Sequence, residues 1–350
     1  MNLRSLHIDA GRAWRGGQRQ VFLLATALRA HGREPLVVGA GGSPLLERLQ
    51  AVGIATASTP MRSDWDLRSA KRLRSIIRAW KPDIVHAHDA RAHAIALIAL
   101  AGDATPLIVT RRVTFPVNSV RVKYGPRVTR FIAISNAVKA AMARSGVDAQ
   151  RIDVVHSGVP TPTATNPRDW RAELGWSRET VIAGVVGAMT AEKGIDAIRH
   201  IASRLSDDAV ERTRVLLLGG TERGPVRLGP ICGHHSGFVT EIHNAMAGLD
   251  LLWHPASEEG LGTVLIDALG LEIPPIAFDV GGVGEIIESG KNGLLVPFGD
   301  IQGFASAHIS MLSPARRQQL ADAGPSRAAV FSVEAMRDGV ERVYQRVLTA

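Results

Sequence analysis

The chain has 350 residues, of which 45% are hydrophobic and 21% charged, and its formal net charge is +8. This length leaves room for two domains, and the composition is that of a globular protein, which excludes a disordered one. The one cysteine, Cys232, excludes a disulfide framework and a cysteine-based metal cluster, which fits a reducing cytoplasm. The apolar runs are too short for a signal peptide or a membrane span, so we expect a cytoplasmic protein.

The charge is divided unevenly along the chain. Residues 1–160 contain 24 Lys and Arg against 10 Asp and Glu, a net charge of +14, whereas residues 161–350 contain 17 against 23, a net charge of −6. A basic half favours an anionic partner, such as a phospholipid surface, a phosphorylated glycan or a nucleic acid. The same charge is also consistent with a bias towards arginine that serves only solubility.

Short aliphatic runs alternate with longer amphipathic ones in the first half of the chain. The pattern predicts strands at residues 3–8, 35–38, 84–86, 107–110, 131–134 and 152–155. It predicts helices at residues 18–31, 44–51, 66–80, 90–101 and 136–144, the last of them capped by Ser135. This alternation indicates a parallel, doubly wound α/β sheet.

Residues 158–167 are rich in Pro and Thr and lack apolar periodicity, so we place a linker there. The alternation then restarts, with strands expected at residues 181–186, 214–218, 251–254, 275–278 and 293–296. Helices are expected at residues 195–205, 241–247, 264–269, 300–312 and 332–348. We therefore predict two Rossmann-like domains, 1–160 and 161–331, a closing helix within 332–350, and ligands in the cleft between the domains.

The most informative stretch follows the predicted strand 251–254. Glu259 heads a loop that contains Gly260 and Gly262, and Asp267 lies eight residues after Glu259 on a predicted helix. Glycines let the backbone approach a ligand closely, and the N–H groups at a helix start attract an anion. Two carboxylates around such a cradle suit a ligand with both phosphates and hydroxyls, such as a nucleotide sugar. The alternative is a plain loop before a core helix.

Other turns lie between a predicted strand and a predicted helix. Gly16 and Gly17 do not belong to a Gly-x-Gly-x-x-Gly fingerprint, yet a turn of this kind can accept a diphosphate through backbone N–H groups. Lys193, six residues after Gly187, can place its ammonium on a phosphate oxygen. The glycine-rich turn at 281–285 either lines the same cleft or only connects two elements. The alternative for Gly16 and Gly17 is a tight turn without a ligand, and the alternative for Lys193 is a solvated surface lysine.

These motifs occur in one order: Gly16-Gly17, His86-x-His88, Gly187 with Glu192-Lys193-Gly194, Glu259-Gly260-Leu261-Gly262 with Asp267-Ala268, and Gly281-Gly282 with Glu285. The order resembles the family 4 glycosyltransferases of the GT-B fold, over nearly the whole chain. The resemblance implies two Rossmann-like domains facing across a cleft, the first for the acceptor and the second for the donor, with the last helix crossing back to the first. It also implies retaining transfer of a hexose-type sugar from a nucleotide-sugar donor, without a metal ion or other cofactor.

The resemblance also implies roles for single residues. Gly16 and Gly17 would approach the diphosphate and Lys193 would bind it. Glu259 would hold sugar hydroxyls, and Asp267 would hold the ribose hydroxyls. The amides that would meet the sugar and the phosphate are those of Gly260, Leu261, Gly262 and Thr263. We take Lys193, Glu259 and Arg112 as the candidate catalytic residues.

The chain departs from the family pattern at three positions. Asp267 stands where the family usually has a longer Glu, and Ala188 stands where it often has an arginine that contacts phosphate, a role that Arg15 could take over. Arg112 lies at or near the place of a family histidine after the fifth strand. Arginine cannot act as a general base. It could stabilise the departing phosphate or an anionic acceptor, so we place Arg112, with Arg111 and His88, on the acceptor side.

Two rival functions remain open at this point. His86-x-His88 with Asp89 and His93 is a metal-ligand pattern of hydrolases, although structural histidines explain it too. The departures from the family pattern would also fit a degenerate sugar-nucleotide-binding protein with little catalysis.

The expected acceptor is a cell-envelope glycan or a lipid-linked glycan, with no nucleic acid as partner. The predicted helix 66–80 has an apolar side for the core and a basic outer side. That basic side favours peripheral contact with the inner face of an anionic membrane.

Overall fold

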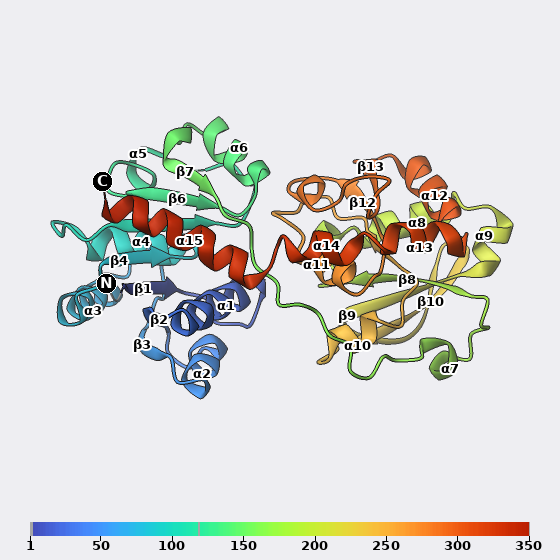
Figure 1. Ribbon diagram of the computed structural model, residues 1–350, viewed down its shortest axis with the longest axis horizontal. Coiled ribbons are helices and arrows are strands. Elements are labelled where there is room, and N and C mark those ends of the chain that lie inside the picture. Colours follow the sequence, from blue (N-terminus) through green and yellow to red (C-terminus); the bar gives the residue numbers. More distant parts are fainter. Residues whose placement is uncertain (1–2, 118–119, 350) are drawn as a thin grey trace. The chain divides into compact units, whose positions relative to one another are not determined.

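The computed structural model describes residues 3–117 and 120–349 and divides the chain into two compact units. Unit 1 runs to Gly158 and resumes at Val333, and unit 2 is Val159–Ser332. Each unit is built on a central sheet flanked by helices (Figure 1). Within the described ranges, no helix combines the length and the apolar character that crossing a bilayer requires.

The sheet of unit 1 has seven strands in the order β3-β2-β1-β4-β5-β6-β7. The strands are β1 (Arg4–Asp9), β2 (Glu34–Ala40), β3 (Ala55–Thr59), β4 (Ile84–Ala87), β5 (Leu107–Arg111), β6 (Arg130–Ala133) and β7 (Ile152–Val154). All neighbouring pairs are parallel, which confirms the predicted doubly wound sheet in this unit. The order reverses between β1 and β4, so the carboxyl ends of these two strands flank the switch point where such sheets bind ligands.

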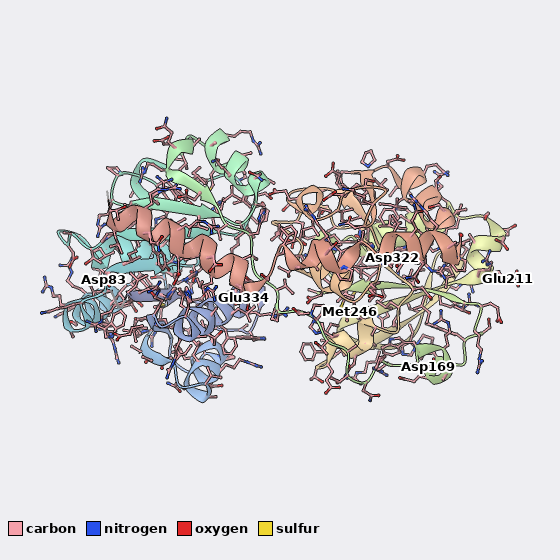
Figure 2. All side chains as sticks on the ribbon, in the orientation of Figure 1. Asp83, Asp169, Glu211, Met246, Asp322 and Glu334 are labelled. Carbon is pink, nitrogen blue, oxygen red and sulfur yellow. The ribbon has the colours of Figure 1, made fainter. Side chains whose placement is uncertain are left out.

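The helices of unit 1 are α1 (Gly16–Ala30), α2 (Pro44–Ala51), α3 (Leu67–Trp80), α4 (Ala90–Ala99), α5 (Val120–Lys123), α6 (Asn136–Arg144) and α15 (Val333–Leu348). The predicted N-cap of α6 is confirmed, because Ser135 Oγ accepts a hydrogen bond from Val138 N at 3.1 Å. The last helix, α15, packs its apolar side on α1 and on the central strands of this unit. Glu334 marks the start of α15 in Figure 2.

The sheet of unit 2 has six strands in the order β10-β9-β8-β11-β12-β13. The strands are β8 (Val181–Val186), β9 (Thr213–Leu228), β10 (Ile231–Gly237), β11 (Leu251–His254), β12 (Pro275–Asp279) and β13 (Leu294–Pro297). This confirms the predicted Rossmann-like domain, with one antiparallel pair at the edge of the sheet, where β10 runs against β9. The glycines at 219, 220 and 224 suggest a turn, but β9 continues through them with positive φ angles.

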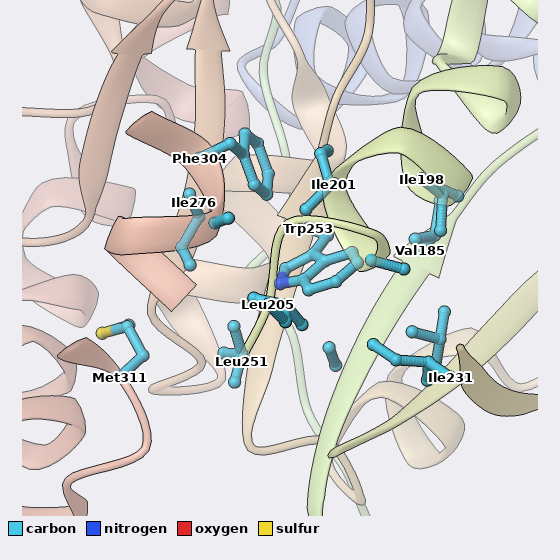
Figure 3. Packing of buried hydrophobic residues seen from close by; sticks show 14 of the residues in the cluster. Val185, Ile198, Ile201, Leu205, Ile231, Leu251, Trp253, Ile276, Phe304 and Met311 are labelled. Carbon is cyan, nitrogen blue, oxygen red and sulfur yellow. The ribbon is translucent and has the colours of Figure 1, made fainter. Parts of the chain in front are cut away.

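The helices of unit 2 are α7 (Trp170–Leu174), α8 (Ile195–Ala202), α9 (Asp207–Arg212), α10 (Ile242–Met246), α11 (Thr263–Gly270), α12 (Ile301–Ser310), α13 (Pro314–Ala321) and α14 (Gly324–Ala329). Trp253 of β11 is fully buried in the core, where aliphatic side chains and Phe304 surround it (Figure 3). Its Nε1 donates to His308 Nδ1 at 3.2 Å, so the buried indole N–H is satisfied. This core fixes β11, the strand that leads into the Glu259 loop.

Candidate active site

Loops that follow three neighbouring strands meet at the carboxyl edge of the unit 2 sheet. The order of strands reverses between β8 and β11, and β12 lies next to β11. Residues 187–194 follow β8, residues 255–262 follow β11, and residues 280–282 follow β12. The predicted donor motifs therefore lie together at the switch point of this sheet.

Two glycines allow these loops to touch. Gly194 has φ +77°, and a Cβ at this residue would lie 1.9 Å from the carbonyl oxygen of Pro255. Gly281 has φ +54°, and a Cβ there would lie 1.7 Å from the carbonyl oxygen of Glu259. Both positions need glycine for its backbone conformation and for its lack of a side chain. The loop after β11 is thus held from both sides.

An ion pair joins the loops after β8 and β11. Lys193 Nζ lies 2.6 Å from Glu259 Oε2, and His254 Nε2 lies 3.4 Å from the same oxygen. Burial alone raises the pKa of Glu259, but the adjacent His254 imidazole and Lys193 ammonium outweigh it and lower the pKa to about 2. Lys193 remains one-third exposed. The pair therefore presents a fixed carboxylate and an accessible ammonium side by side.

The residues after Glu259 turn into α11. Gly262 is the N-cap residue with φ +95°, and no side chain caps the helix. Leu261 is buried, while Gly260 donates its N–H to Glu259 Oε1 at 3.2 Å. Thr263 begins the helix. The start of α11 thus faces the same edge as the ion pair with backbone N–H groups, which favour an anion.

Asp267 lies inside α11 and is only 5% exposed. Its Oδ1 lies 3.0 Å from Nε2 of His243, which comes from α10. This contact of His243 is not predictable from the sequence, because nothing in the spacing between residues 243 and 267 shows that the two helices meet. The structure therefore adds an imidazole that orients the second acid of the motif.

The glycine turn of unit 1 follows β1. Gly16 and Gly17 begin α1 after Arg15, whose backbone is extended and whose side chain does not cap the helix. A Cβ at Gly17 would lie 4.0 Å from Cδ of Arg112. The structure thus brings the glycine turn and Arg112 to the same edge of the unit 1 sheet.

Arg112 follows β5 and is partly buried. Its Nη2 donates to His88 Nδ1 at 3.5 Å, and its Nε has no hydrogen-bond partner in the described part of the chain. Burial lowers the pKa of Arg112 to about 10, and the nearby carboxylates of Asp9 and Asp89 oppose that shift. At neutral pH the guanidinium is therefore charged and incompletely satisfied.

Arg111 points to other partners. Its Nη1 donates to the hydroxyl of Tyr124 at 3.0 Å, and its Nη2 contacts the carbonyl of Phe115. Of the three residues that we placed on the acceptor side, the structure brings His88 and Arg112 together and ties Arg111 to the segment that follows β5.

The histidines of the rival metal hypothesis form a buried group. Ligand atoms of His7, His86 and His88 lie within 4.8 Å of one another, whereas His93 packs edge-on against Tyr124. Every ring nitrogen of the group has a hydrogen-bond partner within the protein. A cation would have to displace these bonds, in a buried site beside the guanidinium described above, so the geometry disfavours a hydrolase metal centre.

Two Rossmann-like units with glycine-rich loops at their switch points are the architecture of the GT-B class of glycosyltransferases. A family model described as Glycosyltransferase Family 4 matches residues 14–162, and one described as Glycosyl transferases group 1 matches residues 180–314. The chain belongs to glycosyltransferase family 4.

Comparison with individual proteins agrees with this assignment. A D-inositol 3-phosphate glycosyltransferase of Rhodococcus opacus (strain B4) is 34% identical over 220 residues, which are 57% of this chain and 49% of that protein. The chain spans about half the length of the curated relatives that it matches first.

Solved structures show the same fold. Anabaena Alr3699/HepE in complex with UDP has a TM-score of 0.84 at 19% identity, covering 98% of this chain and 100% of that one. A glycosyltransferase from Rickettsia africae ESF-5 also has a TM-score of 0.84 at 19% identity, covering 99% of both chains.

Proposed function

We propose that the protein is a retaining glycosyltransferase that moves a hexose-type sugar from a nucleotide-sugar donor to a cell-envelope glycan or a lipid-linked acceptor. The observation that carries the proposal is the Lys193–Glu259 pair at the switch point of unit 2, 2.6 Å apart and next to the uncapped start of α11. An ammonium for phosphate and a carboxylate for hydroxyls are what a nucleotide sugar requires.

Each part of the site has a role in this proposal. Lys193 binds the diphosphate, and Glu259 accepts hydrogen bonds from sugar hydroxyls. Asp267, held by His243, accepts from the ribose hydroxyls. Backbone amides complete the cradle, and they belong to Gly260, Leu261, Gly262 and Thr263. In unit 1, the proposal assigns phosphate contacts to Gly16 and Gly17, and contacts with phosphate or an anionic acceptor to Arg112 and His88.

The chemistry follows from the charges. With a pKa of about 2, Glu259 carries no proton at neutral pH and cannot serve as the general acid, so it binds and orients the sugar. The bond between the anomeric carbon and the diphosphate oxygen breaks while the acceptor oxygen attacks on the same face. The leaving phosphate takes the acceptor proton, and Lys193 offsets its charge. The configuration of the anomeric carbon is thereby retained.

A screen of nucleotide sugars by thermal shift tests the donor assignment. UDP-glucose is the first probe, because structural neighbours were solved with UDP and with UDP-glucose. A bound donor raises the melting temperature, and the rise grows with the logarithm of the donor concentration relative to its Kd. Nucleotide release is measured with the same panel. Binding without turnover in the presence of phosphorylated and lipid-linked acceptors would identify a degenerate binding protein, and stabilisation by no donor would refute the proposal.

For a lipid-linked acceptor we also propose peripheral contact between unit 1 and an anionic membrane. Trp65 and Leu67, at the start of the basic helix α3, are 75% and 67% exposed. Asp64, which precedes Trp65, forms an ion pair with Lys123 of α5 at 2.8 Å. Exposed apolar side chains among basic ones suit an anionic bilayer surface. Co-sedimentation with phosphatidylglycerol vesicles should fall in Trp65→Ser. The matched control is Phe238→Ser, since Phe238 of unit 2 is 72% exposed. Equal binding by both variants would refute the contact.

A further inference from the structure

A chain of hydrogen bonds crosses the interior of unit 1 from Ser5 to Arg112. Ser5 Oγ lies 3.0 Å from His7 Nε2, and His7 Nδ1 lies 2.9 Å from His88 Nε2. His88 Nδ1 in turn lies 3.5 Å from Arg112 Nη2. The residues come from β1 and from positions just after β4 and β5, which are neighbours in the sheet. The order of strands therefore brings these residues together across long stretches of sequence.

The chain of hydrogen bonds can run in one direction only. A guanidinium has donors and no acceptor, so His88 Nδ1 must accept and the proton of His88 must sit on Nε2. That N–H donates to His7 Nδ1, which places the proton of His7 on Nε2, from where it is donated to Ser5 Oγ. Burial lowers the pKa of His7 to about 3 and that of His88 well below its usual range, so both rings are neutral.

The carboxylates near Arg112 are occupied by other donors. Asp9 accepts hydrogen bonds from the Gly11 amide and the Gln18 side chain, at 2.8 and 2.9 Å. Asp89 accepts from backbone amides of residues 10, 91 and 92. Within residues 3–117 and 120–349, Arg112 forms no ion pair and has the imidazole of His88 as its hydrogen-bond partner.

We propose that His88 and His7 are positioning residues, which hold the guanidinium of Arg112 in the orientation that its anionic ligand requires. The proposal rests on the proposed function, in which Arg112 contacts a phosphate or an anionic acceptor. A neutral acceptor suits this task better than a carboxylate. A carboxylate as hydrogen-bond partner would pair directly with Arg112, whereas an imidazole fixes the direction of one N–H and adds no negative charge to that of the nearby Asp9 and Asp89.

Long-range ¹H–¹⁵N NMR spectra of the full chain test the direction of the hydrogen bonds without any substrate. At pH 7 both His7 and His88 should be neutral with the proton on Nε2, and the variants His7→Gln and His88→Gln assign their signals. A proton on Nδ1 of His88, or a charged ring at either position, would overturn the proposal. Because no turnover is needed, this result stands whether or not the protein transfers a sugar.

A matched pair of substitutions at one position tests the effect on catalysis. His88→Asn places an amide oxygen near the site of Nδ1 and keeps a partner for Arg112, whereas His88→Gln reaches towards His7 and leaves Arg112 without a partner. With UDP-glucose or the donor that the screen selects, kcat should be roughly tenfold lower in His88→Gln than in His88→Asn, as for the loss of one hydrogen bond to a charged group. The KM for the donor and the melting temperature should be similar in the two variants.

Controls separate positioning from a structural role. His308→Gln alters a buried neutral histidine of unit 2, which bonds to Thr213 and Trp253, and should leave kcat unchanged while lowering the melting temperature. Equal kcat in the two His88 variants would overturn the proposal. If the wild type turns over no donor, the proposed function fails. The NMR result still decides whether the hydrogen bonds run from Arg112 through His88 and His7 to Ser5.

Discussion

Glu259 is ionised at neutral pH, because its neighbours lower its pKa to about 2. Its partners are an ammonium on one side and a buried imidazole on the other. A carboxylate held in this way is a fixed hydrogen-bond acceptor. In the proposed function its role is therefore recognition, and charge stabilisation is assigned to Lys193.

We expect Lys193→Ala and Glu259→Gln each to lower kcat/KM for the donor by at least about 100-fold, as for the loss of a preorganised charge in an active site. The melting temperature should fall more in Lys193→Ala, which leaves the 15% exposed Glu259 carboxylate without its ammonium partner, than in Glu259→Gln, which removes that charge. Lys291→Ala, which breaks an exposed ion pair with Glu288 in the same unit, is the control and should retain wild-type turnover. Wild-type rates in both site variants would show that the site is elsewhere.

The buried histidine group leads to a second prediction at this scale. Since its ring nitrogens are already paired, Zn²⁺ added in a fivefold excess should not raise the melting temperature by more than about 1 °C. Calorimetry and inductively coupled plasma mass spectrometry measure this directly. Stoichiometric zinc that survives dialysis and is lost on chelation, together with a fall in melting temperature, would support the hydrolase hypothesis.

At the scale of elements, the loop after β11 depends on the loops on either side of it. Gly281→Ala should therefore do more than strain the backbone, because its Cβ would meet the carbonyl oxygen of Glu259 at 1.7 Å. Gly290 also has a positive φ, +84°, but a Cβ there meets nothing within 4 Å. Gly290→Ala should cost about 1–2 kcal/mol of stability and leave donor affinity unchanged.

The pair of glycine variants separates strain from displacement of the loop. We expect Gly281→Ala to weaken donor binding at least tenfold, measured by calorimetric titration, since it must move the backbone of Glu259. Donor affinities that are equal in the two variants would show that the contact between the loops after β11 and β12 does not shape the site.

Periodicity predicted most long elements, and the errors have physical causes. The predictions for α2, α6, β8 and β11 match the structure residue for residue, because each carries a clear apolar pattern. The hairpin of β9 and β10 was missed, since Gly, Pro and charged residues in its sequence favour turns over an edge strand. The short helices α7 and α13 were missed, because their few residues show too little apolar periodicity.

The candidate site was predictable only in part for a related reason. Glycines and charges at strand ends indicated Lys193 and Glu259, whose roles stay predictions. The partners His243, His254 and His7 were not selected, because their contacts depend on which strands and helices become neighbours. His7 and His88, for instance, are 81 positions apart and meet through the pairing of β1 with β4.

At the scale of the whole molecule, the two units differ in their buried histidines. Burial lowers the pKa of four in the described part of unit 1, namely His7, His86, His88 and His93. In the described part of unit 2 it lowers the pKa of the deeply buried His308 and of the partly exposed His234. A histidine with a lowered pKa stays neutral in the folded state and takes up a proton when unfolded. Its contribution is therefore complete above pH 6.5 and is lost as the pH falls towards the folded pKa.

We expect unit 1 to lose stability before unit 2 between pH 6.5 and pH 5.5. At one pH unit below 6.5, each deeply buried histidine should lower the free energy of unfolding by about 1.4 kcal/mol. The pKa of Asp9 is raised, so this one carboxyl group has the opposite effect on stability as the pH falls. Hydrogen exchange with mass spectrometry resolves the units, and peptides of β1 and β4 should lose protection before those of β8 and β11. Equal loss in both units would contradict the assignment.

The ion pair between Lys193 and Glu259 has a further consequence, for ligand selection. In the free protein Lys193 and Glu259 bind each other, so an incoming ligand must offer a new partner to each of them. Inorganic pyrophosphate would capture the ammonium and leave the carboxylate facing a second anion at close range. A molecule with hydroxyls beside its phosphates satisfies both partners at once. In the proposed function, the resting pair would thus favour binding of whole sugar donors over bare diphosphates.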